Sequence, residues 1–213
     1  MPARNALKRY AENGYYHLYN RGVAKGEIFL DPQDYAVFLS YLKQYLSPVE
    51  IQQPTTEGPS QAFYWYTPKN YWGEIELFAF CLMPNHFHLL TKQKQPRSIE
   101  SFMRSLLIRY SQYFNKRYQR VGHVFQGVYK GALIDTEQYL WWLSRYIHRN
   151  PLENLKKEQK LSDYSYSSYP AYLGQWSAKW VKPGEILSQV KNYQTFVEGE
   201  TEQEPDLLPI LEG

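Results

Sequence analysis

The chain has 213 residues, a formal charge of +3, 43% hydrophobic and 21% charged residues, values typical of one globular domain or one domain with an extension. Its single cysteine, Cys81, excludes an intrachain disulfide and a zinc site built on cysteines. We expect a cytosolic protein with no membrane partner, because neither a signal peptide nor a long apolar span is visible.

The first predicted elements are a strand and a helix. Residues 15–20 are predicted to form a strand, and turn chemistry at residues 20–22 leaves Arg21 near the end of that strand. Asp31 and Pro32 are typical of a helix start, as cap and first residue. Apolar residues then follow at helical spacing: Tyr35, Phe38, Leu39, Leu42, Tyr45 and Leu46.

Two apolar runs joined by Pro84-Asn85 form the centre of the sequence. We interpret them as buried strands connected by a turn. His86 and His88 stand two residues apart and therefore point to the same face of their strand, while Phe87 points to the other. Two imidazoles on a rigid strand can begin a divalent-metal site. Taken alone, however, this pattern is more often two unrelated histidines.

The second half of the chain predicts two more helices and a strand. Apolar residues from Ile99 to Phe114 recur at helical spacing, residues 123–134 are predicted to be extended, and a third helix runs from about Thr136 to Arg149. The order of elements predicts an α+β fold: a ferredoxin-like or RRM-like antiparallel sheet with helices on one face. This domain spans residues 1–150, with an insertion loop at about 47–72 marked by four prolines.

Two segments follow the predicted domain. Residues 151–197 form an aromatic-rich extension, and residues 198–213 form an acidic tail that we expect to be disordered. The tail holds six acidic residues and no Lys or Arg, so the body is more basic than the overall charge suggests. A basic body rich in tyrosine indicates a polyanionic partner.

The third predicted helix carries Tyr146 and Asn150, which lie one above the other on the same helix face. Pro151 is expected to bias Asn150 away from helical geometry, so that register is approximate. A tyrosine hydroxyl beside a metal and an arginine is a plausible nucleophile toward phosphorus. Spacing alone favours the simpler interpretation, in which Tyr139, Trp142 and Tyr146 form a core stripe.

Five stretches, in order, resemble the HUH-type single-tyrosine (Y1) transposases, and among them the REP-associated tyrosine transposases. They are Tyr16-His17-Leu18-Tyr19-Asn20-Arg21-Gly22, Met83-Pro84-Asn85-His86-Phe87-His88-Leu89-Leu90, Gly122-His123-Val124-Phe125-Gln126-Gly127, Arg145-Tyr146-Ile147-His148-Arg149-Asn150-Pro151, and Tyr166-Ser167-Ser168-Tyr169 with Ala171-Tyr172-Leu173-Gly174. The resemblance covers about residues 15–174 and implies the HUH endonuclease fold.

The resemblance also implies a chemistry. His86 and His88 would hold Mg²⁺ or Mn²⁺ with Asn150 as a third, oxygen ligand, and Tyr146 would attack a phosphate in single-stranded DNA beside a hairpin. The product would be a 5′-phosphotyrosine and a free 3′-hydroxyl. Residues expected to contact DNA are Asn20, Arg21, Arg117, Lys130, Arg145 and Arg149. His148 lies about 200° round the helix from Tyr146 and is expected to be non-catalytic.

Two departures from the family pattern leave alternatives open. Val128 stands where relatives usually carry Arg, and residues 152–157 replace their usual Arg-Ala-Gly stretch. The first alternative is a metal-dependent nuclease that uses water, with Tyr146 in a structural role. The second is an inactive relative that only holds a DNA hairpin on its sheet. The sequence is compatible with either a monomer or a homodimer.

Overall fold

A four-stranded antiparallel sheet in the order β2-β3-β1-β4 organises the computed structural model, which describes residues 10–49, 69–155 and 158–200. The strands are β1 (Tyr15–Arg21), β2 (Ile75–Met83), β3 (His86–Gln93) and β4 (Lys130–Ile134). The long helices are α1 (Pro32–Leu46), α2 (Ser98–Arg117) and α3 (Glu137–Arg149). The predicted order of elements and the α+β class are confirmed.

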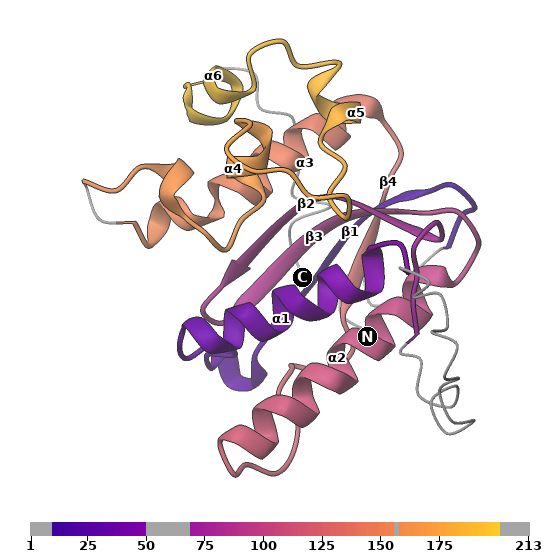
Figure 1. Ribbon diagram of the computed structural model, residues 1–213, viewed down its shortest axis with the longest axis vertical. Helices are drawn as coiled ribbons and strands as arrows, with labels where there is room; N and C mark the ends of the chain where they lie inside the picture. Colours follow the sequence, from indigo (N-terminus) through magenta and orange to yellow (C-terminus); the bar gives the residue numbers. More distant parts are fainter. Residues whose placement is uncertain (1–9, 50–68, 156–157, 201–213) are drawn as a thin grey trace, which may run out of the picture.

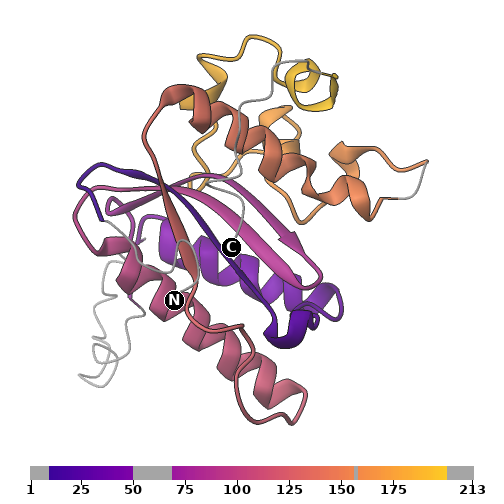
Figure 2. The ribbon, with the colours of Figure 1, turned by 180° about the vertical axis from the view of Figure 1, so that it is seen from behind.

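The sheet separates two hydrophobic cores (Figure 1). Helices α1 and α2 cover one face, where residues such as Leu18, Phe87 and Leu89 pack against them. Helix α3 covers the opposite face, as the view from behind shows (Figure 2), and it contributes Leu140, Leu143 and Ile147 to the second core. The prediction of helices on one face of the sheet therefore holds for α1 and α2. Helix α3 lies on the opposite face.

The C-terminal extension packs against α3. It contains the short helices α4 (Tyr169–Tyr172), α5 (Gly184–Leu187) and α6 (Tyr193–Glu198), with 3₁₀ turns at Asn150–Glu153 and Leu161–Asp163. His148 is fully buried here, hydrogen-bonded to the Tyr193 hydroxyl (2.7 Å) and the Ser168 hydroxyl (2.7 Å). The domain boundary at residue 150 stays a prediction.

Local sequence accounts for the ends of most elements. Asp31 caps α1 by accepting hydrogen bonds from the backbone N–H groups of Gln33 (2.9 Å) and Asp34 (3.3 Å), as predicted. The strand predicted over residues 123–134 is shorter, because Gly122 and Gly127 adopt positive φ angles of 95° and 74° and bend the chain before β4 begins. Most of the predicted insertion loop and acidic tail lies outside the described residues.

None of the helices in the described segments combines the length and the apolar character that crossing a membrane requires.

Candidate active site

The candidate site lies where β3 begins, on the sheet face that α3 covers. His86 and His88 point to this face, and antiparallel pairing sets Arg21 of β1 beside His86 and Tyr19 beside His88. Phe87 points to the other face, where it is fully buried against Phe38. The alternation predicted from the sequence is therefore what aims both imidazoles toward α3.

The ring of His86 is oriented by the turn residue before it. Its Nδ1 lies 2.6 Å from Asn85 Oδ1, and the Asn85 amide nitrogen donates to the Lys25 carbonyl (3.2 Å), which identifies Oδ1 as the acceptor facing His86. The N–H of neutral His86 is thus on Nδ1, and its Nε2 carries a lone pair. That Nε2 faces Asn150 Oδ1 at 3.5 Å.

Asn150 turns its side-chain oxygen toward Nε2 of His86. Its amide nitrogen donates to the Tyr146 carbonyl (2.9 Å), so its Oδ1 is turned toward His86. Asn150 keeps helical angles (φ −47°, ψ −40°), so the predicted distortion by Pro151 is wrong, because Pro151 begins a 3₁₀ turn that continues the helix. Two lone pairs then face each other, an arrangement that a cation between them stabilises.

His88 supplies a third lone pair. Its Nδ1 lies 2.8 Å from Nε2 of His17 on β1, and its buried Nε2 has no hydrogen-bond partner within the described segments. Burial lowers the pKa of His88 well below its usual value, and the neighbouring rings of His17 and His86 act in the same direction. His88 is therefore neutral, the form that binds metals.

These observations fit a divalent ion held by two imidazoles and an amide oxygen. His86 and His88 have ring centroids 5.0 Å apart in a perpendicular arrangement, and the amide of Asn150 completes the set. Among the described residues no group of three or more His, Cys, Asp or Glu side chains forms an alternative metal cluster. Neutral imidazole nitrogen and amide oxygen are both established ligand types for divalent ions.

Tyr146 stands over the histidines from α3. Its ring lies 5.5 Å from the ring of His88 and 6.3 Å from that of His17, edge-on to both. Burial raises the pKa of its phenol, with a hydrogen bond to Asn150 acting in the opposite direction, so the hydroxyl is neutral at pH 7. The buried stripe of α3 is formed by Leu140, Leu143 and Ile147, and Tyr146 lies beside it, half-buried.

Two of the predicted DNA contacts flank the site. Arg21 is exposed at the end of β1, and Lys130 is paired with Tyr19 in the sheet register, so both side chains leave from the face that carries the histidines. Burial lowers the pKa of Lys130, and the positive charge of Arg21 adds to this shift. Together they form a small cationic edge beside the site.

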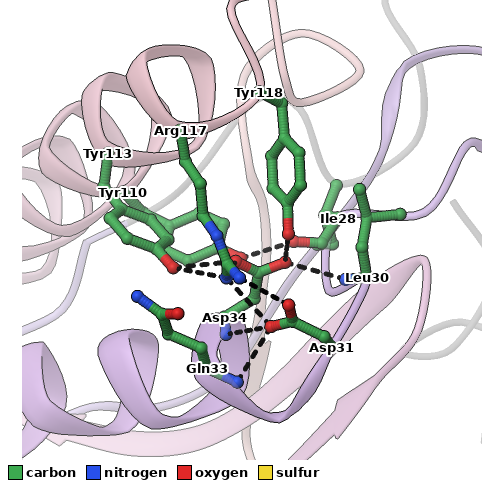
Figure 3. Close-up of polar contacts among 9 residues, drawn as sticks. All are labelled: Ile28, Leu30, Asp31, Gln33, Asp34, Tyr110, Tyr113, Arg117 and Tyr118. Atoms are coloured by element: carbon green, nitrogen blue, oxygen red, sulfur yellow. Dashed lines mark hydrogen bonds and ion pairs between the residues drawn. The ribbon is translucent and has the colours of Figure 1, made fainter.

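The other predicted DNA contacts make intramolecular interactions. Asn20 points to the α2 side of the sheet and donates to the Gly127 carbonyl (3.3 Å). Arg117 forms ion pairs with Asp31 and with the buried Asp34 (2.7 Å) (Figure 3). Arg145 and Arg149 donate to backbone carbonyls at the end of α6, those of Phe196 (2.7 Å), Gly199 (2.9 Å) and Val197 (2.6 Å). Their DNA contacts stay predictions, although this geometry favours structural roles.

His17 and Asn85 belong to the site but were not assigned to it from the sequence. Both lie in stretches that resemble the family, and alternation along β1 places His17 on the same face as Tyr19 and Arg21. That signal shows which face His17 occupies. It does not show that the register of β1 on β3 brings His17 against His88.

The fold and the site define an α+β sheet protein in which a helix-borne tyrosine faces paired histidines on the central strand. Residues 66–150 match the model of a family described as "Transposase IS200 like". This match covers less than half of the chain and agrees with the resemblance to the Y1 group that the sequence motifs indicated. No curated protein shows significant sequence similarity to the chain.

Two solved structures extend the comparison. A REP-associated tyrosine transposase bound to a REP hairpin matches with a TM-score of 0.54 at 13% identity, covering 84% of this chain and 91% of that one. This likeness confirms the predicted fold. A candidate transposase from Deinococcus radiodurans R1 has a TM-score of 0.38 at 15% identity, covering 70% of this chain and 97% of that one, which is too distant to support an argument.

Proposed function

We propose that this protein cuts and rejoins single-stranded DNA beside a hairpin, with Tyr146 as the nucleophile. The observation that carries the proposal is a group of donor atoms beside Tyr146. His86 Nε2 lies 3.5 Å from Asn150 Oδ1, and the ring of His88, whose buried Nε2 has no hydrogen-bond partner in the described segments, lies 5.0 Å from that of His86 and 5.5 Å from that of Tyr146. Arg21 and Lys130 lie at the side, where a phosphate backbone can be held.

His86, His88 and Asn150 would hold a divalent ion, Mg²⁺ or Mn²⁺. When bound, such an ion would polarise the scissile phosphate and offset its charge. The side chains would orient the ion and the DNA. The two histidines are neutral, and hydrogen bonds with His17 and Asn85 hold their rings in place. Arg21 and Lys130 bind the flanking phosphates.

The cleavage step is a displacement at phosphorus. The Tyr146 oxygen forms a bond to phosphorus as the bond from phosphorus to the 3′ oxygen breaks. The phenol loses its proton and the departing 3′ oxygen gains one, so no proton is consumed overall. The products are a 5′-phosphotyrosine and a free 3′-hydroxyl, and a 3′-hydroxyl of a second strand reverses the step to rejoin DNA. No nucleotide cofactor is needed, because the phosphotyrosine conserves the energy of the broken bond.

A hairpin is the proposed recognition element because the REP-associated relative of the same fold was solved with a REP hairpin bound. The aromatic content of the chain also suits contacts with unpaired bases.

One observation supports a second candidate function, that of a hairpin-binding relative without cleavage. Val128 is 69% exposed on the loop before β4, where the family pattern leads us to expect Arg. An apolar residue at this position removes one cation from the expected phosphate path, and hairpin binding could persist without turnover.

The test uses the full chain, Mg²⁺ and end-labelled single strands from the DNA that flanks its own gene. The proposal predicts cleavage together with a covalent protein–DNA adduct that survives denaturation. Cleavage without an adduct would instead support a nuclease that uses water. Hairpin binding with no cleavage in either Mg²⁺ or Mn²⁺ would support the second candidate.

A further inference from the structure

Resting on the proposed metal site, we propose that His17 and Asn85 are positioning residues that set which ring nitrogen of His88 and of His86 faces the metal. Neither would touch the ion. Each instead holds the far side of a ligand ring, so that the proton stays on Nδ1 and the lone pair of Nε2 points into the site.

The case for His17 begins with its burial and its neighbours. Its ring is fully buried against the rings of Tyr19 (centroids 4.6 Å apart) and His88 (5.0 Å), so it is packed in place and shielded from solvent. Its Nε2 lies 2.8 Å from His88 Nδ1. One of these two nitrogens must carry the hydrogen, and that choice fixes the tautomer of both rings.

The surroundings of His88 decide between the two choices. If His17 donated, the only N–H of His88 would be on Nε2, which is buried and has no acceptor in the described segments. A buried donor without a partner is rarer in proteins than a buried acceptor without one. With His88 donating from Nδ1 to His17, the buried Nε2 carries a lone pair instead, the form that a metal completes.

The turn at Asn85 does the same for His86 by different means. The Asn85 backbone carbonyl accepts from the Gly22 N–H (2.8 Å), and its side chain spans from His86 Nδ1 to the Lys25 carbonyl. Lys25 has a left-handed backbone (φ 60°), which non-glycine residues rarely adopt. Such a conformation at a tight turn is typical of a segment held in place by its surroundings.

The test compares variants of the full chain that keep the packing but change the acceptor. His17→Phe retains an aromatic ring beside Tyr19 and His88 and removes the acceptor, whereas His17→Gln restores one. Thr91→Val is the matched control, since Thr91 is buried on the same strand as His88 but on the opposite face. Asn85→Ala tests the turn independently.

Two measurements are made on each variant: the Mn²⁺ affinity by calorimetry, and the histidine tautomers of the metal-free protein by long-range ¹⁵N–¹H NMR. We expect His86 and His88 to carry hydrogen on Nδ1 in the original chain. His17→Phe should weaken Mn²⁺ binding about 10- to 100-fold and shift the His88 hydrogen toward Nε2. His17→Gln should recover most of the affinity, Asn85→Ala should change the tautomer of His86 alone, and Thr91→Val should change nothing.

Either of two results would overturn the inference. One is a hydrogen on Nε2 of His88 in the original metal-free protein. The other is a His17→Phe variant that keeps both the Nδ1 tautomer of His88 and the original Mn²⁺ affinity. If the original chain bound no Mn²⁺ at all, the proposed function would fail, yet the tautomer spectra would still decide the roles of His17 and Asn85. The spectra of the original chain also decide them if His17→Phe does not fold.

Discussion

We predict that Arg21 contacts DNA whereas Arg117 has a structural role, and a comparison of Arg21→Met with Arg117→Met tests this directly. Both substitutions replace a guanidinium with an uncharged side chain of similar length. Arg21 is exposed beside the histidines, whereas Arg117 faces two carboxylates, Asp31 and the fully buried Asp34. One guanidinium opposite two carboxylates leaves that cluster negative, which repels phosphates (Figure 3).

The magnitude follows from counterion release. Each phosphate contact on a single strand contributes about 0.7 to the slope of log affinity against log salt concentration. Arg21→Met should therefore lower the slope for hairpin DNA by about 0.7. Arg117→Met should leave the slope unchanged and lower the melting temperature instead. Within the described segments the buried Asp34 then keeps only uncharged donors, including the hydroxyls of Tyr113 and Tyr118.

The assay is hairpin binding by fluorescence anisotropy at several salt concentrations, with thermal melting of the same samples. An equal loss of slope in the two variants would refute this reasoning and restore Arg117 as a phosphate contact. An unchanged slope in Arg21→Met would remove Arg21 from the proposed phosphate path.

Three further predictions concern metal, substrate and pH. His88→Ala or excess EDTA should abolish cleavage in Mg²⁺ while most hairpin binding persists, since phosphate contacts supply most of the affinity; cleavage that survives either treatment would exclude the metal. A single-stranded hairpin should bind more tightly than the same sequence as a perfect duplex at physiological salt, and equal affinities would indicate generic electrostatic binding. The hydrogen bond from Arg117 holds the pKa of Asp31 below its usual 3.8. The ion pair between Arg117 and Asp31 therefore stabilises the folded state fully above pH 3.8, and this contribution is lost as the pH falls through the lowered pKa. Unfolding free energies measured down to this range should therefore fall less in Arg117→Met than in the original chain, and identical profiles would contradict the assignment.

The sequence was sufficient for the elements whose signals are local. Alternation aimed His86 and His88 to one face, Asp31 marked the start of α1, and helical spacing identified α2. Each of these depends on residues a few positions apart, so the physics of one strand or one turn determines the result. The element order then limited the fold to an antiparallel sheet, as observed.

Features that depend on contacts between distant residues could not be predicted in this way. His17 and His88 are 71 positions apart, and only the register of β1 on β3 brings them together. The same holds for Arg117, whose carboxylate partners lie more than 80 positions away, and for Arg145, which reaches carbonyls beyond residue 195. A basic residue in a sequence predicts a phosphate contact and an internal ion pair equally well.

The central claim is that Tyr146 forms the bond to DNA, and it is tested most directly by mapping the covalent adduct. After cleavage of a labelled single strand, protease digestion and mass spectrometry should place the nucleotide on the peptide that contains Tyr146. Tyr146→Phe should keep its melting temperature to within a few degrees, because it loses one hydroxyl worth about 1 kcal/mol, yet give neither adduct nor cleavage. An active Tyr146→Phe protein, or an adduct that maps to Tyr129 or Tyr139, would contradict the assignment.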